Sequence, residues 1–184
     1  MTAQRDHGIR PRSTHRAPVG ADHRLFRGVP PAVPSDLALR IGMGSTPFAA
    51  RRIPAATDCC SVARQFTRRT LLGWDLSSGL CDDTVQIASE LVANAVRHGR
   101  PRGARAAADP PPTVWLALAL RPRTLLCVVR DPSRRRPRLT CPAPLAERHR
   151  GLPIIDALST SWGWTDDHGP HGKSVWARLT LPPA

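Results

Sequence analysis

Two neighbouring apolar runs in the second half of the chain constrain its fold most strongly. TVWLALALR (113–121) and TLLCVVRD (124–131) are rich in Val, Leu, Trp and Cys and are joined by a tight Arg-Pro-Arg turn. Two such runs separated by a short turn are typical of a β-hairpin. Because few charged residues interrupt them, at least one face of this hairpin is expected to be well buried.

Two amphipathic helices are predicted before the hairpin. The first begins at Thr57, or at Asp58 as its N-cap, and ends near Gly73, since glycine commonly terminates a helix. Helical spacing predicts a central row of Val62, Phe66 and Thr70, with Ala63 and Leu71 beside it.

The second helix begins near Ser77 or Ser78 and ends before Gly99. One broad face of it is apolar, as expected of a helix packed on a core. Glu90 and Asn94, four residues apart, project together from the border of that face. Taken alone, such a pair is more often a solvated helix flank than part of a functional site. The apolar residues of the face are Val85, Ala88, Leu91, Val92, Ala95 and Val96.

The other segments complete an α/β pattern. A short edge strand ended by proline is expected at 48–54. Residues 132–150 hold four Pro and six Arg without a usable period and are predicted as a long loop. A short helix at 151–160, a strand and turn at 161–167 and a final strand at 172–181 follow. This order predicts an α/β two-layer sandwich, with a mixed or antiparallel sheet covered on one face by helices.

The chain divides into an N-terminal arm and one domain. Its 184 residues are enough for one domain with its own core. Residues 1–47 are rich in Arg and Pro with little periodicity, so we expect a basic, disordered arm before a domain at 48–184. Residues 1–56 hold nine Arg and three Asp, a net +6 of the total +13. Nearly half of the excess charge therefore precedes the predicted helices.

Composition also restricts the class of protein. No apolar run approaches the ~20 residues of a membrane span, and the start lacks the apolar segment of a signal peptide. The five Cys form no CxxC and no zinc-finger spacing, which favours reduced thiols and a cytoplasmic address. His168 and His171, near Asp166 and Asp167, fit a Gly/Pro-rich turn better than a metal site, since no fourth convergent ligand is evident.

The net charge of +13 would attract any anion. Nucleic acid is one candidate partner, but the sequence contains no recognisable helix-turn-helix, RRM or zinc motif. We therefore expect nucleic acid to bind only non-specifically, through the basic arm.

Four segments, in this order, resemble those of a known family. ELVANAVRHG (90–99) is similar to the N-box of histidine-kinase-like, Bergerat-fold ATPases, and VVRDP (128–132) to their adenine-binding box. RGLPIIDAL (150–158) resembles the glycine-containing box, and GKSVWARL (172–179) the closing strand. The set resembles most the actinobacterial ATP-binding regulators related to anti-sigma-factor serine/threonine kinases, over about residues 48–181.

The resemblance implies ATP and Mg²⁺ as cofactors and assigns roles to three polar residues. Asn94 would be the Mg²⁺ ligand, because Mg²⁺ prefers oxygen ligands. Glu90, one helical turn away, would be the general base of phosphoryl transfer. Asp131, at the end of a strand, would accept the exocyclic amine of adenine; as an isolated residue it could be only a turn former before Pro132.

The resemblance also implies a set of phosphate contacts. Gly151 leads into a helix whose N-terminus would bind anions, although a more complete motif has another glycine in place of His149. The single Lys of the chain lies in the closing strand and would contact a phosphate; a surface lysine is the alternative. DPSRR lacks the glycines of the usual D-x-G-x-G pattern. The nucleotide-binding residues implied in addition to Asn94 and Asp131 are His98, Gly99, Arg148, Arg150, Gly151, Leu152 and Lys173.

Three functions compete on this basis. The first is a protein serine/threonine kinase that phosphorylates an anti-anti-sigma-like antagonist and so controls a sigma factor, with a homodimer as one expected assembly. The second is an ATP-dependent switch that binds its partner without transferring phosphate, which the incomplete glycine boxes favour. A basic nucleic-acid-binding protein is the weakest third. A histidine kinase is disfavoured, because no dimerisation and phospho-acceptor helix precedes the ATPase segments.

Overall fold

The computed structural model of the chain describes residues 47–98, 113–133, 135–137, 151–166 and 172–182. Several predicted segments therefore lie outside the described residues. They are most of the N-terminal arm, residues 99–112 and 167–171, and most of the loop before residue 151. So do Cys141, His168 and His171.

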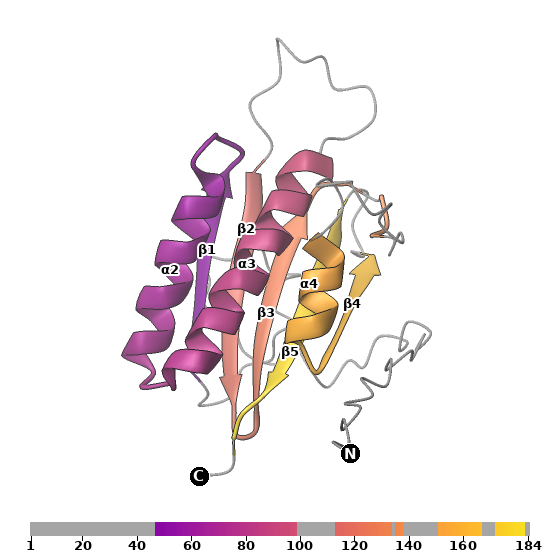
Figure 1. The fold of residues 1–184 in the computed structure, drawn as a ribbon. Coiled ribbons are helices and arrows are strands. Elements are labelled where there is room, and N and C mark those ends of the chain that lie inside the picture. The colour runs from indigo at the N-terminus through magenta and orange to yellow at the C-terminus, as the bar shows by residue number, and fades with distance from the viewer. Residues whose placement is uncertain (1–46, 99–112, 134, 138–150, 167–171, 183–184) are drawn as a thin grey trace, which may run out of the picture.

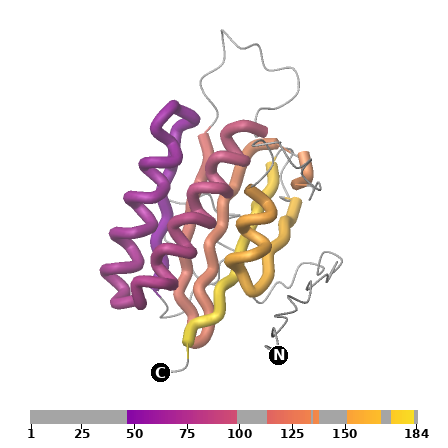
Figure 2. Tube along the Cα trace, viewed as in Figure 1, coloured from indigo at the N-terminus to yellow at the C-terminus, as the bar shows by residue number. Residues whose placement is uncertain are grey.

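The described residues form an antiparallel sheet of five strands with three helices on one of its faces (Figures 1 and 2). The strands lie in the order β1-β2-β3-β5-β4, and every neighbouring pair is antiparallel. The predicted two-layer α/β sandwich is confirmed, with the sheet antiparallel rather than mixed. The elements are β1 (Phe48–Pro54), α2 (Cys59–Gly73), α3 (Ser78–His98), β2 (Thr113–Arg121), β3 (Thr124–Asp131), α4 (Gly151–Leu158), β4 (Ser161–Asp166) and β5 (Lys173–Thr180).

The predicted hairpin forms the centre of the sheet as β2 and β3. Its register pairs Ala117 with Val128, and side chains alternate between the two faces as in any strand. Those facing the helices, such as Leu118 and Cys127, are fully buried in the main core. Burial in this apolar layer raises the pKa of the Cys127 thiol to about 12. The opposite face carries a second, smaller apolar cluster of Ala117, Ala119, Leu126 and Val128, packed against Phe48, Ala50, Trp115 and Trp176.

Helix α2 has the predicted bounds but a different buried row. The predicted centre at Val62 and Phe66 lies only half-buried at the border of the core, so that prediction is wrong by one residue. Ala63 and Leu71, which were predicted beside that row, belong to the buried row itself, together with the polar Thr67, which is completely buried. The row that faces the core is Cys59, Ala63, Thr67 and Leu71.

Helix α3 lies across the middle of the sheet and contacts α2, α4 and β3 (Figure 1). All of its predicted apolar residues enter the core except Val96, which is half-buried. This confirms the predicted face and puts its border, with Glu90 and Asn94, on the side of α4. None of the described helices is long and apolar enough to cross a membrane.

Candidate functional site

Four segments singled out by the sequence meet at one end of the sheet. The carboxyl end of β3 and the start of β5 are hydrogen-bonded neighbours there, because Asp131 pairs with Lys173 in the strand register. The C-terminal half of α3 and the first turn of α4 lie over the same end (Figure 1). Polar groups far apart in the sequence are therefore brought to one region of the molecule.

Glu90 and Asn94 are the polar groups that α3 contributes. Both side chains are half-buried, at the border between the core-facing side of α3 and its exposed side. One turn earlier, Gln86 donates a hydrogen bond from Nε2 to Glu90 Oε1 at 3.1 Å. This i,i+4 contact restrains the Glu90 carboxylate without burying it.

The first residue of α4 makes a close approach to this pair. A Cβ added at Gly151 would lie 2.8 Å from Glu90 Oε2 and 2.9 Å from Asn94 Nδ2. Carbon atoms do not occupy such positions without displacement of a neighbour, so glycine permits this contact. The N-terminus of α4, whose first N–H groups have no acceptor within the helix and which carries a partial positive charge, therefore lies close to a carboxylate and an amide.

Helix α4 is held in this position from its other side. Ile155 is completely buried in the main core, and Trp162 donates from Nε1 to Asp156 Oδ1 at 2.8 Å. Leu152, which the resemblance implied as a nucleotide contact, packs half-buried against the core. These contacts from the end of α4 and from β4 fix where its N-terminus points.

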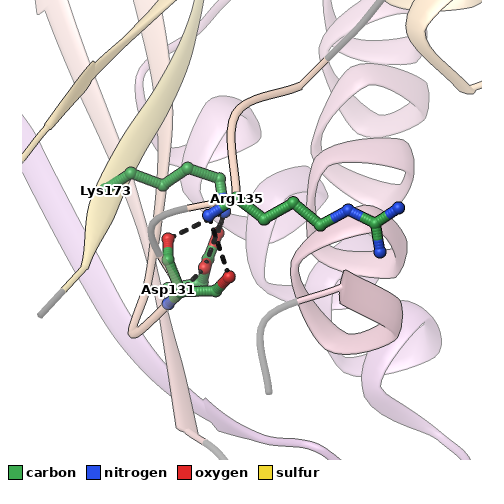
Figure 3. A network of polar contacts seen from close by, with 4 residues as sticks. Asp131, Arg135 and Lys173 are labelled. Atoms are coloured by element: carbon green, nitrogen blue, oxygen red, sulfur yellow. Dashed lines mark hydrogen bonds and ion pairs between the residues drawn. The ribbon is translucent and has the colours of Figure 1, made fainter. Parts of the chain in front are cut away.

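The second polar pair of the region is buried between two strands. Lys173 Nζ lies 2.7 Å from Asp131 Oδ2 and 2.8 Å from Asp131 Oδ1 (Figure 3). The two side chains are 4% and 1% exposed, respectively. Gly172, whose φ of 128° suits glycine, turns the chain into β5 immediately before this lysine. The alternative of a surface lysine is therefore wrong, whereas a contact between Lys173 and a phosphate stays a prediction.

Side chains build the turn that follows β3. Asp131 Oδ1 accepts a hydrogen bond from the N–H of Ser133 at 2.8 Å, and Ser133 Oγ accepts one from the N–H of Arg135 at 3.1 Å. Asp131 is thus a turn former as well as half of an ion pair. The Arg135 side chain extends away from this pair (Figure 3). Sequence reasoning missed Ser133 and Arg135, although Asp-Pro-Ser is a recognisable turn signal.

The remaining predicted residues divide into two groups. His98 is the half-buried last residue of α3, at the same end of the molecule. Gly99, Arg148 and Arg150 lie outside the described residues. The geometry thus brings together Glu90, Asn94 and Gly151, and separately Asp131 and Lys173.

The donor set near Gly151 fits a phosphate-bound Mg²⁺. Within the described ranges no three His, Cys, Asp or Glu side chains form a metal-binding group. Mg²⁺ does not need one, because it usually keeps several waters and takes one or two protein oxygens together with phosphate oxygens. The amide oxygen of Asn94, beside a helix N-terminus able to bind the phosphates, provides such a combination.

Comparisons with known proteins point to one family. The family model described as histidine kinase-like ATPase domain matches residues 53–179. The chain is also similar to the crystal structure of the RsbU and RsbW domains of Rv1364c from Mycobacterium tuberculosis, with 22% sequence identity and a TM-score of 0.52. That alignment covers 74% of this chain and 33% of the solved chain, so it supports the fold alone. None of the curated proteins compared matches the chain.

Proposed function

Because this chain belongs to the histidine kinase-like ATPase domain family, we propose that it binds Mg-ATP and transfers the γ-phosphate to a Ser or Thr of an antagonist protein. Its partners would be that anti-anti-sigma-like antagonist and the sigma factor that the antagonist controls. The observation that carries the proposal is the close approach of Gly151 to both Glu90 and Asn94, where an added Cβ would lie 2.8 Å and 2.9 Å from their side chains. This approach places the proposed general base and the proposed metal ligand beside a helix N-terminus that could bind anions.

The nucleotide would lie along the shared end of the sheet and helices. Asp131 accepts the exocyclic amine of adenine, and the N-terminus of α4 binds the phosphates. Because Pro153 has no N–H, the donors of this first turn come from Gly151, Leu152 and Ile154. Asn94 Oδ1 would hold Mg²⁺, which when bound neutralises charge on the phosphate oxygens.

Glu90 would act as the general base. Its carboxylate accepts the proton of the substrate hydroxyl as that oxygen forms its bond to the γ-phosphorus, and the bond to the β-phosphate oxygen breaks to release ADP. Gln86 holds one carboxylate oxygen and leaves the base half-exposed. The nucleotide contacts expected of His98, Gly99, Arg148 and Arg150 remain part of this proposal.

An ATP-dependent switch without phosphate transfer is the second candidate. It is favoured by the close approach of Glu90 Oε2 to the start of α4. A carboxylate so near the end of a helix would couple nucleotide binding to the position of that helix. A homodimer is compatible with either function and stays a prediction. Binding of nucleic acid through the N-terminal arm is the weakest proposal.

Isothermal titration with Mg-ATP tests the binding step. We expect Asn94→Ala to weaken binding by about tenfold or more, because it removes the proposed metal ligand. Asp83→Ala, near the start of the same helix, should leave the affinity unchanged. Equal affinities of the wild-type and Asn94→Ala proteins would contradict the assignment.

Phosphate transfer separates the two candidate functions. Radiolabelled ATP is supplied with antagonist proteins encoded next to this chain, and the labelled protein is measured. For a kinase, the wild type labels an antagonist, whereas Glu90→Gln binds Mg-ATP with similar affinity and labels it at least about a hundredfold more slowly. If the wild type binds Mg-ATP and labels none of them, the switch replaces the kinase.

A further inference from the structure

Lys173, the only lysine of the chain, is nearly completely buried, and it pairs with Asp131, the carboxylate proposed to bind adenine. We propose that Lys173 is a positioning residue for adenine recognition, which acts through Asp131 and makes no contact with the phosphates of ATP. This inference rests on the proposed function, because it takes Asp131 to be the residue that meets the base.

The hydrogen bonds of Lys173 leave no donor for a phosphate. A lysine ammonium has three N–H donors and no acceptor. Here it is 2.8 Å from Asp131 Oδ1 and 2.7 Å from Asp131 Oδ2 (Figure 3). It is also 3.1 Å from the carbonyl oxygen of Ser133. All three donors are therefore matched by acceptors of its own chain. A phosphate could engage this ammonium only by breaking one of these buried contacts.

The ion pair gives Asp131 the state that adenine recognition needs. A carboxylate as buried as this one is stable in its charged form only when it is paired and hydrogen-bonded. An ionised carboxylate can accept hydrogen bonds but cannot donate them. Lys173 thus keeps Asp131 selective for a base with an N–H donor, such as the 6-amino group of adenine, over one with a carbonyl oxygen in that place.

The same contacts also fix the direction of the carboxylate. Lys173 binds both oxygens from β5, and the N–H of Ser133 binds Oδ1 from the following turn. Restraints from two elements prevent the carboxylate from rotating about its bond to the strand. Loss of Lys173 would let the carboxylate rotate and would therefore weaken its contact with adenine.

Ligands with and without phosphates separate this role from a phosphate contact. Dissociation constants are measured by NMR titration for adenosine and for Mg-ATP, with full-length wild type, Lys173→Met, Lys173→Arg, Asp131→Asn and the double variant Lys173→Met with Asp131→Asn. Arg136→Met is the matched control. It removes one positive charge from the same end of the sheet, at a side chain that is 64% exposed and paired with Asp166.

We expect Lys173→Met to weaken the binding of adenosine and of Mg-ATP by the same factor, of about tenfold or more. Lys173→Arg should restore part of both affinities. Arg136→Met should leave the affinity for adenosine unchanged. A loss confined to Mg-ATP would overturn the proposal, as would unchanged affinity for both ligands. If the wild type binds neither ligand, the proposed function itself fails, which is a distinct result.

The double variant keeps the test valid if Lys173→Met alone does not fold. It replaces a buried charged pair by two neutral side chains and so leaves no unpaired charge. We expect its affinities for adenosine and Mg-ATP to equal those of Asp131→Asn, because Lys173 acts only through Asp131. A further loss of Mg-ATP affinity in the double variant would identify a direct phosphate contact and overturn the proposal.

Discussion

Two polar clusters at the same end of the molecule are built in opposite ways. Glu90 and Asn94 lie half-buried on a helix, against the N-terminus of another helix at Gly151. Asp131 and Lys173 lie between two strands and are almost completely buried. The first cluster keeps access to solvent, as its proposed contacts with a metal, a phosphate and a hydroxyl require. The second holds its charges in one buried ion pair, which would make Asp131 a rigid acceptor in the proposed recognition of adenine.

The largest loss of stability is expected from a substitution that breaks the buried ion pair. Lys173→Met leaves the Asp131 carboxylate without its cation, so we expect the free energy of unfolding to fall by about 3–5 kcal/mol. The exposed pair between Arg136 and Asp166 has an N–O distance of 2.9 Å, yet Arg136→Met should cost less than about 1 kcal/mol. Denaturant unfolding measures both. Equal losses would mean that burial does not distinguish the two pairs.

A smaller effect is expected in the half-buried cluster. Gly151→Ala places a Cβ against the ends of the Glu90 and Asn94 side chains, which can move, so the loss of stability should be about 1 kcal/mol. The displacement of both side chains should weaken Mg-ATP binding by about tenfold. Calorimetry and thermal unfolding measure the two quantities.

Gly79→Ala provides the control, because a Cβ added at Gly79, in the first turn of α3, meets nothing within 4 Å. Alanine favours the helix, so stability should rise by up to about 1 kcal/mol. Mg-ATP binding should be unchanged. If Gly151→Ala also bound Mg-ATP like the wild type, the close approach would have no part in the site.

The smallest effect is expected when Glu90, the proposed general base, loses its hydrogen bond from Gln86. Gln86→Ala removes the hydrogen bond to Glu90, an exposed i,i+4 contact worth about 0.2–0.5 kcal/mol. We expect the rate of phosphate transfer to fall by only about twofold, with Mg-ATP affinity unchanged and the loss of stability no larger than the energy of this contact. A rate as low as that of Glu90→Gln would show that Gln86 has a larger part in catalysis than an orienting contact.

The two clusters also differ in how far the sequence predicted them. Helical spacing was enough to predict that Glu90 and Asn94 share one side of α3, because both belong to the same element. Their contact with Gly151 depends on how α4 packs, which no local pattern contains. Asp131 was predicted at the end of its strand and Lys173 at the start of another, but their pairing follows from the order β3-β5 in the sheet.

The fold was predicted more completely than the site. The hairpin and the buried face of α3 follow from apolar periodicity, which depends on the chain's own spacing. In α2 the predicted row, with Thr70, and the adjacent buried row, with Thr67, each combine apolar residues with a threonine. Which of two such rows faces the core depends on their neighbours in space, so the pattern placed the core-facing row one residue away.

We propose that the two clusters bind opposite ends of one nucleotide. A crystal structure of the full chain with Mg²⁺ and a non-hydrolysable ATP analogue would test this arrangement. We predict that the adenine amine is within hydrogen-bond distance of Asp131, that Asn94 Oδ1 ligates Mg²⁺, and that the phosphates lie at the N-terminus of α4. Lys173 should still be paired with Asp131. A nucleotide bound elsewhere, or with its phosphates at Lys173 and its adenine away from Asp131, would contradict this arrangement.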